Sequence, residues 1–420
     1  MKKPFGPQQR IFLATAIIAV WVGLSAQSTM AATVYVGTCV ANVTPYATIQ
    51  AAVNAAKPGS TISACPGNYP EQVVINKDLT LTGYQPAGAQ KTVLVIPPGG
   101  FVANATGLTS SRAIAAQILV QSPATEVTIS FLAVDGTGSN LNGGCFEPPL
   151  IGIYYQGASG TIEDVVARNQ AQDLANFGCG GSAAVGIFVE SGNSEQAAVA
   201  ILNSTVRGFQ KSGIVANEAG TTVRINGNSV VGAGPSIGAV PTPIAQNGIQ
   251  IAFGATGTIE NNILADDDFG GDPSLGTATG ILVYASGSLK IIGNSITNTQ
   301  TGIVTLTAGN LKADGNTLTN NQVTDTHVGD GIDLCSNSNI VFANSVFSSD
   351  EAGIHLDGEC GSTGNSNTVT LNTVNEACAA ILLGGSENII SATNTFANVA
   401  NTTLAGDVCP RVTQKSRLMG

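Results

Sequence analysis

Basic side chains are scarce in this sequence, and their scarcity excludes several classes of partner. The 420 residues contain 16 Lys and Arg against 27 Asp and Glu, which gives a formal net charge of −11. Removal of the three basic residues in the first 32 positions would lower the charge to −14. Between Ile225 and Pro410 only Lys290 and Lys312 are basic. We therefore expect no binding to nucleic acid, and repulsion of other polyanions unless a cation intervenes.

Long apolar runs are absent after the N-terminus. The N-terminal segment has three basic residues, an apolar run from Ile11 to Ala26 and small residues that end at Ala31 and Ala32, which is the layout of a secretory signal peptide. The run has about 16 residues against the roughly 20 that a spanning helix needs, so we favour cleavage near Ala31 or Ala32 over a membrane anchor. The mature protein is therefore expected to be soluble and secreted, periplasmic or at the cell surface.

Cys-x-x-Cys pairs and Cys/His clusters are also absent, which argues against a zinc or haem site. Two histidines and three methionines are too few soft ligands for copper delivery. The even number of cysteines in an exported chain suggests disulfides. Many pairings remain open, and sequential pairing is the simplest for the repeat architecture described next. The eight are Cys39, Cys65, Cys145, Cys179, Cys335, Cys360, Cys378 and Cys409.

Glycine is abundant, with 51 of the 420 residues, while charged residues make up only 10% of the chain. Together with frequent Val, Ile, Thr and Asn, this composition indicates many short strands joined by tight turns. A Gly-Ile pair or a close equivalent recurs, with shortest spacings of 22 residues and longer ones that read as 22 plus a loop. The pairs begin at Gly152, Gly186, Gly213, Gly248, Gly280, Gly302, Gly331, Gly353 and Ala380.

We call the recurring Gly-Ile pairs the first ladder. A second ladder runs beside it and consists of Asn, then a small or polar residue, then an apolar residue. Two ladders with matching periods define a coil, and successive coils pair in parallel about 4.8 Å apart. Asn can occupy a left-handed turn and stack its amide on the Asn of the next coil, so we interpret the ladder as structural and not as a ligand site. Its triplets begin at Asn228, Asn261, Asn294, Asn316, Asn344, Asn372 and Asn394.

A cap is expected at the N-terminal end, because an open solenoid end would template aggregation. The segment from Tyr46 to Ala56 places Ile49 and Val53 on one helical face, and Lys57-Pro58-Gly59 ends the helix. The sequence thus predicts an all-β parallel β-helix with a short N-terminal capping helix. The expected boundaries are a signal peptide at 1–32, the cap and first coils at 33–83, the repeats at 84–400 and a C-terminal tail at 401–420.

A resemblance to a known superfamily begins at the cap. The N-terminal entry of the pectate-lyase-like superfamily resembles the run from Thr48 to Gly83, TIQAAVNAAKPGSTISACPGNYPEQVVINKDLTLTG, and the downstream ladders resemble its repeats up to about Val399. The resemblance implies a right-handed parallel β-helix. It implies no single activity, since that superfamily includes polysaccharide lyases, inverting glycoside hydrolases, uronate epimerases, periplasmic accessory proteins of the nitrous-oxide reductase type and adhesins.

Both histidines fall near one lengthened coil. His327 lies in a loop that extends a coil from 22 to 29 residues, and insertions on a solenoid often collect on its binding face. The alternation of side chains places Asp333 and His355 outward on adjacent coils, about 4.8 Å apart at the backbone. Asp357 is diagonal to Asp333 at roughly 8 Å, inside the roughly 6.5 to 9.5 Å window for the carboxyl pair of an inverting glycosidase.

We therefore expect Asp333, Asp357 and His355 to line a polysaccharide cleft, where one carboxylic acid protonates a leaving oxygen and one carboxylate activates water. The alternative is a solvated polar face on an acidic protein, because exposed Asp is common. The adjoining loop adds three candidates for an acid, a base or a cation ligand, namely Asp325, His327 and Asp330.

Motifs of the superfamily narrow the chemistry. Pectate lyases use a basic residue next to the uronate and polygalacturonases carry an Arg-x-Lys element, and neither stands near these residues. Uronate epimerases of the alginate type use an Asp-Pro-His loop, which Asp325-Thr326-His327 matches only loosely. If the chain is an enzyme, these departures favour hydrolysis of a neutral or weakly acidic glycan over a lyase reaction. The second hypothesis is a non-catalytic surface or periplasmic β-helix that binds glycan or a protein partner.

No cofactor is expected apart from calcium. The run Asp266-Asp267-Asp268, followed by Asp272, offers the clustered carboxylates that calcium prefers. The alternative is an acidic loop between coils, because no ordered ligand spacing is visible. We expect a monomer with a polysaccharide as its partner, and no association with membranes after signal cleavage.

Overall fold

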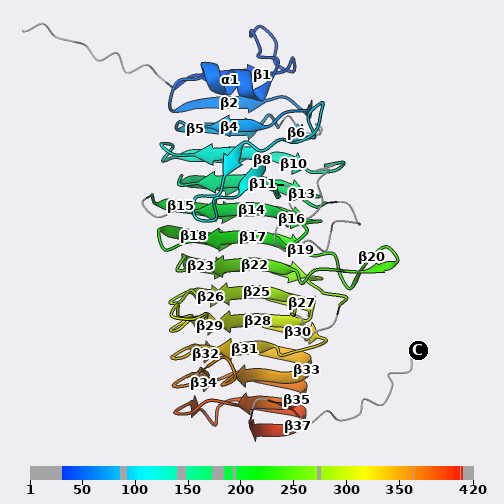
Figure 1. The fold of residues 1–420 in the computed structure, drawn as a ribbon, viewed down its shortest axis with the longest axis vertical. Coiled ribbons are helices and arrows are strands. Elements are labelled where there is room, and N and C mark those ends of the chain that lie inside the picture. Colours follow the sequence, from blue (N-terminus) through cyan, green and yellow to red (C-terminus); the bar gives the residue numbers. More distant parts are fainter. Residues whose placement is uncertain are drawn as a thin grey trace, which may run out of the picture.

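The computed structural model describes residues 31–85, 92–139, 148–172, 184–192, 195–271, 276–361, 363–406 and 408–409. In this part the chain winds as a solenoid of stacked coils, with helix α1 at one end and strand β37 at the other (Figure 1). Residues 1–30 of the expected signal peptide lie outside the described residues, as do Cys145, Cys179, Asp272 and most of the expected tail.

Most coils contribute a strand to each of three faces, and neighbouring coils pair in parallel. The first face is a sheet of 13 strands: β1 (Thr33–Val36), β2 (Ser60–Ala64), β5 (Leu79–Gly83), β9 (Val127–Ser130), β12 (Gly160–Glu163), β15 (Ala197–Leu202), β18 (Thr221–Asn226), β23 (Thr256–Glu260), β26 (Lys290–Ile292), β29 (Thr317–Thr319), β32 (Ile340–Phe342), β34 (Thr368–Thr370) and β36 (Ile389–Ile390).

The second face carries the candidate site and is called the site face below. Its strands are β4 (Val73–Ile75), β8 (Ala113–Gln121), β11 (Leu150–Gln156), β14 (Val185–Glu190), β17 (Ser212–Asn217), β22 (Asn247–Ala252), β25 (Thr279–Tyr284), β28 (Thr301–Leu306), β31 (Ile332–Cys335), β33 (Ser345–Leu356), β35 (Thr373–Leu383) and β37 (Thr395–Ala405).

The third face joins the site face at a corner, because β33, β35 and β37 run through both. Its other strands are β3 (Gly67–Tyr69), β6 (Thr92–Leu94), β10 (Leu132–Asp135), β13 (Val166–Arg168), β16 (Thr205–Arg207), β19 (Ser229–Val231), β24 (Ile263–Ala265), β27 (Ser295–Thr299) and β30 (Gln322–Thr326). Short antiparallel pairings involve β7 (Ala105–Thr106) with β8, and β20 (Ser236–Ile237) with β21 (Val240–Pro241).

The core is a stack of apolar columns inside the three faces. The Ile of every Gly-Ile pair in the first ladder is fully buried, as the alternation predicts. The preceding Gly is needed because the coils approach closely at that corner. A Cβ at Gly302 would lie 2.3 Å from the carbonyl oxygen of Gly331 and 2.4 Å from Cγ1 of Val323. The Gly-Ile pair therefore recurs every 22 residues for two reasons. The Ile fills the core column, and the Gly allows the close contact between backbones.

The expected cap is helix α1 (Ile49–Ala55), which buries Ile49, Ala52 and Val53 over the first coil. It begins at Ile49 because Thr48 is extended and its side chain accepts a hydrogen bond from the N–H of Ala51. The carboxylate of Glu71 accepts two further N–H groups of the first turn. The cap is confirmed, although the helix is shorter than the segment that the pattern suggests.

The Asn residues form two ladders, where the sequence suggested one. In each ladder the side-chain amide of one Asn donates to Oδ1 of the next, and most members are buried. The left-handed residue is usually the one before the ladder Asn, for example Asn261 before Asn262. The first ladder is Asn228, Asn262, Asn294, Asn321, Asn344, Asn372 and Asn394, and the second contains Asn316, Asn339 and Asn367. Assigning Asn261 and Asn316 to the first ladder was therefore wrong, while its structural role is confirmed.

Three disulfides follow the sequential pairing: Cys39–Cys65, Cys335–Cys360 and Cys378–Cys409. The last strand, β37, runs past the expected domain boundary at residue 400. Within the described residues no helix has the length and apolar character that crossing a membrane requires.

Candidate functional site

Asp333 and His355 lie side by side on the outer surface of the site face. Asp333 of β31 pairs in register with His355 of β33, and the neighbours on either side are Val304 and Leu382. The neighbouring residues Ile332 and Ile354 point into the core and fix the direction of both polar side chains. The register predicted from the Gly-Ile ladder is therefore confirmed.

Asp330 joins these two residues from the turn before β31. Its Oδ2 lies 3.1 Å from Nδ1 of His355, and its Oδ1 accepts the N–H of Ala352 at 2.8 Å. One ligand-type atom of each of Asp330, Asp333 and His355 lies within 4.8 Å of the other two. We call these three residues the acid cluster. Asp330 and His355 are buried, whereas Asp333 is partly exposed and gives the cluster its access to solvent.

The charges within the acid cluster oppose one another. Burial raises the pKa of Asp333 well above its usual range, and the charge of Asp330 raises it further, while His355 acts in the opposite direction. Burial lowers the pKa of His355, but the hydrogen bond and charge of Asp330 outweigh this and raise it to about 9. Burial and the charge of Asp330 thus favour the protonated form of Asp333 beside the ion pair between Asp330 and His355. Oδ1 of Asp333 is buried and has no hydrogen-bond partner among the described residues.

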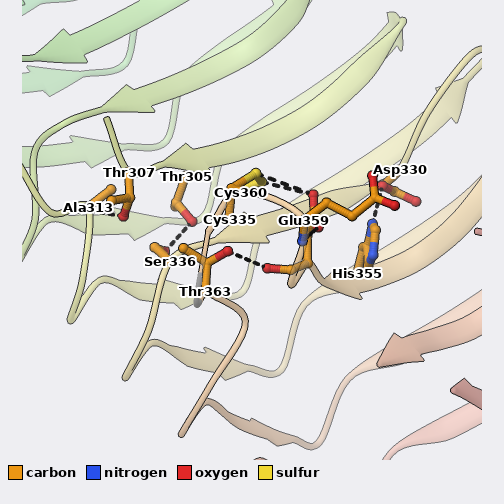
Figure 2. The surroundings of a disulfide bond; sticks show 11 residues. Thr305, Thr307, Ala313, Asp330, Cys335, Ser336, His355, Glu359, Cys360 and Thr363 are labelled. Carbon is orange, nitrogen blue, oxygen red and sulfur yellow. Dashed lines mark hydrogen bonds and ion pairs between the residues drawn. A yellow bond between two sulfur atoms is a disulfide. The ribbon is translucent and has the colours of Figure 1, made fainter. Parts of the chain in front are cut away.

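Asp357 lies at the end of β33, beside the disulfide Cys335–Cys360. Its Oδ2 is 2.9 Å from Sγ of Cys335 and 3.5 Å from Sγ of Cys360, and its Oδ1 accepts the N–H of Glu359. Figure 2 shows Glu359, two residues after Asp357, between the disulfide and the pair formed by Asp330 and His355. The disulfide therefore bounds the site, a role that the cysteine pattern alone did not indicate.

The other two loop candidates lie outside the acid cluster. Nε2 of His327 is 2.8 Å from Oδ2 of Asp268, and this hydrogen bond is the main reason that the pKa of His327 is raised. Asp325 is exposed and has a positive φ of 56°. It shares this left-handed turn position with Asn298 of the previous coil, and Asp and Asn tolerate such a conformation well. The structure accordingly gives Asp325 a turn role.

The three carboxylates proposed for calcium do not converge. Asp266 occupies the same left-handed turn position and accepts a hydrogen bond from Asn298. Asp267 is fully buried, with its pKa raised by burial first and then by its acidic neighbours, and Asp268 faces His327. The groups that could hold a metal among the described residues are instead those of the acid cluster. The sulfur atoms beside Asp357 are not free ligands, because they form a disulfide.

The arrangement can transfer protons. A carboxylic acid that stays protonated near neutral pH can donate to a leaving oxygen, and a nearby carboxylate can accept a proton from water. The acid cluster holds a carboxyl group whose pKa is raised, and Asp357 is a further carboxyl group on the same surface. Sequence reasoning missed two neighbours of the candidate residues. Asp268 is the partner of His327, and the charge of Glu351 also raises the pKa of Asp333.

Comparisons with known proteins agree with this architecture. A family model described as "Right handed beta helix region" matches residues 241–396. No curated protein matches the sequence. Among solved structures, the A-module of mannuronan C-5 epimerase AlgE4 from Azotobacter vinelandii is 14% identical, with a TM-score of 0.50 over 84% of this chain and 92% of that one.

Two further solved structures are similar to this chain. The GH136 lacto-N-biosidase from Eubacterium ramulus is 10% identical, with a TM-score of 0.54 over 90% of this chain and 68% of that one. A rhamnogalacturonan lyase is 11% identical, with a TM-score of 0.51 over 81% of this chain and 87% of that one. At these identities the likeness shows the fold alone. The chain has the fold of a right-handed parallel β-helix, as the sequence predicts.

Proposed function

We propose that this chain is an exported glycoside hydrolase that acts on a polysaccharide at the site face. Asp333 is the general acid that protonates the leaving glycosidic oxygen, and Asp357 is the general base that activates water. Asp330 and His355 position Asp333 and set its protonation state. The solved proteins of the same fold include a lacto-N-biosidase and two proteins named for uronan substrates, which supports a glycan as the substrate class.

The observation that carries the proposal is the environment of Asp333. Its carboxyl group is held within 4.8 Å of Asp330 and His355, and burial together with the charge of Asp330 raises its pKa. A carboxylic acid that must donate a proton near neutral pH needs such an environment. An exposed Asp on a solvated face would have none of these features.

Distance supports Asp357 over Asp330 as the base. Asp330 lies too close to Asp333, because an inverting pair needs roughly 6.5 to 9.5 Å to admit a water molecule. Asp330 is also occupied by the N–H of Ala352 and by His355. Asp357 remains as the base, since it lies one coil and two residues from Asp333 and is outside the acid cluster.

The test is an activity assay of the purified mature chain on a panel of plant, algal and bacterial polysaccharides. Its two readouts are the release of reducing ends and the absorbance of unsaturated uronides. Reducing ends without absorbance are expected, and Asp333→Asn or Asp357→Asn should lower the rate by about 10² to 10⁴. Asp164→Asn is the matched control, because Asp164 lies in a distant coil with a positive φ of 53° that Asn also tolerates.

An absorbance signal would instead mean a lyase and would overturn the proposal. Silence across the panel from a folded protein would favour the second function, a non-catalytic β-helix that binds glycan or a protein partner. The burial of Asp330 and His355 is the observation on the side of that second function, because only Asp333 of the acid cluster meets solvent.

A further inference from the structure

Two aromatic side chains form an exposed pair on the edge of the site face where its strands end. Phe253 directly follows β22 and is 40% exposed, and Tyr284 is the last residue of β25 and is partly exposed. Their rings meet edge to face, with centroids 5.4 Å apart and an angle of 78° between their planes. The edge-to-face contact and the hydrogen bond from the N–H of Phe253 to the carbonyl of Tyr284 fix the pair in place.

The chain turns at Phe253. Its φ of 55° places a bulky aromatic residue in the left-handed region, where Gly, Asn and Asp are the common occupants. Ala285 at the equivalent position of the next coil has a φ of 53°, so this left-handed residue belongs to a turn that neighbouring coils share at this edge. The conformation keeps the ring of Phe253 at the surface next to Tyr284, whereas the preceding residue, Ala252, is buried.

The aromatic pair is aligned with the proposed active site. Tyr284, Leu306 and Cys335 are in register on three successive coils, and Asp357 follows on the next, where its N–H donates to Leu334. Three coil spacings of about 4.8 Å separate Tyr284 from Asp357, or about 14 Å. One coil spacing is close to the length of one sugar residue in an extended glycan. A chain that lies along the solenoid axis therefore reaches both places.

The negative charge of this surface favours a neutral sugar over an anionic one. The segment from Ile225 to Pro410 contains only Lys290 and Lys312 as basic residues, and Glu218 lies next to the aromatic pair, with its N–H bonded to the carbonyl of Ala252. An anionic uronan would meet repulsion on this surface. The apolar face of a neutral pyranose carries no such cost, and the C–H bonds on that face can contact an aromatic ring.

We propose that Phe253 and Tyr284 form a stacking subsite for a neutral pyranose residue of a glycan whose chain continues along the same edge to Asp357. The subsite deepens the proposed function and rests on it for the position of the cleaved bond. Binding at the subsite itself does not require catalysis, and the two can therefore be tested separately.

The test is affinity electrophoresis of the full mature chain carrying Asp333→Asn, in gels that contain laminarin, dextran, arabinogalactan or polygalacturonate. At least one neutral polymer is expected to retard the protein, and polygalacturonate is not. Adding Phe253→Ala or Tyr284→Ala should raise the apparent dissociation constant about fivefold to tenfold, the range expected for one aromatic contact.

Phe131→Ala is the matched control. Phe131 is 41% exposed and has a positive φ of 54°, so the substitution makes the same change in exposure and in backbone strain at a site on the first face. Phe131→Ala should leave retardation unchanged, and thermal unfolding of each variant checks that the fold is intact.

Retardation that survives both Phe253→Ala and Tyr284→Ala would overturn the subsite, and so would retardation by polygalacturonate alone or by no polymer. The parent chain with Asp333 intact separates the two proposals. If the parent chain has no hydrolytic activity but Phe253→Ala abolishes its retardation, the hydrolase proposal is refuted and the subsite stands. Hydrolysis together with unchanged retardation in Phe253→Ala would refute the subsite alone.

Discussion

Nδ1 of His355 lies 3.1 Å from Oδ2 of Asp330, and the two side chains are only 6% and 7% exposed. This ion pair is one of two between a histidine and an aspartate in the described part of the chain, and the other joins His327 to Asp268. The two histidines differ in burial and in their neighbours, because only His355 also faces Asp333. This difference leads to separate expectations for stability and for activity.

The stability of the fold should fall as the pH rises from 6.5 to 9.5. The pKa of His355 is about 9 in the folded protein and about 6.5 in an unfolded chain, so its proton stabilises the fold below pH 6.5 and this stabilisation disappears as the pH passes 9. The difference corresponds to roughly 3 kcal/mol. Urea unfolding at pH 6.5 and 9.5 should therefore show a steeper loss in the parent than in His355→Gln. Equal losses in the two chains would contradict the charged state assigned to His355.

Replacement of either histidine by Gln should separate their roles. His327 is partly exposed, so loss of its bond to Asp268 should cost about 1 kcal/mol and leave hydrolysis within about twofold of the parent. His355→Gln removes the partner of Asp330 inside the acid cluster and should lower the rate at least about tenfold. The measurements are initial rates and unfolding midpoints of both variants. A rate for His327→Gln as low as that for His355→Gln would place His327 in the active site.

The Asn ladder should contribute strongly to stability. Oδ1 of Asn294 accepts both the backbone N–H and the side-chain amide of Asn262, so Asn294→Ala leaves buried donors without an acceptor. We expect a loss of at least about 2 kcal/mol in the free energy of unfolding, measured in urea. Asn310→Ala is the control at an exposed position and should change it by less than about 0.5 kcal/mol. A similar effect at both positions would show that the ladder bonds contribute little.

Two disulfides of nearly equal span separate stability from activity. Cys39–Cys65 and Cys335–Cys360 close segments of 26 and 25 residues, so replacing either pair by Ser should lower the free energy of unfolding by about 2 to 4 kcal/mol. Only the second pair contacts Asp357, and its removal alone should lower hydrolysis. Rates measured well below both unfolding midpoints distinguish the two variants. Equal rates would show that Asp357 is held without the disulfide.

The coil itself could be predicted because its core repeats. Each Gly-Ile pair must bury one side chain and bring two backbones together, and both demands leave a period in the sequence. The register of Asp333 with His355 followed from the same period. The Asn ladders were harder to assign, because Asn316 and Asn321 lie in successive turns of one coil and period alone does not separate them.

The partners within the site could not be predicted, because they depend on the path of loops and on side-chain reach. Asp330 meets His355 through the turn before β31. His327 contacts Asp268 across an intervening coil. Gln300 of that coil instead accepts the N–H of Ala278 and donates to the carbonyl of Phe269. Asp325 could have been recognised as a turn residue, since the equivalent position of the previous coil is Asn298.

The loop closed by Cys335–Cys360 contains both His355 and Asp357, and it brings Asp357 against the sulfur atoms. Disulfides of this kind form where thiols are oxidised and stay open in the cytosol. In the exported hydrolase proposed above, a chain whose cysteines are still reduced would lack the contact between Asp357 and the disulfide. Assembly of the proposed catalytic groups would then coincide with arrival in an oxidising compartment, which would keep the activity away from the glycans of the cell that makes it.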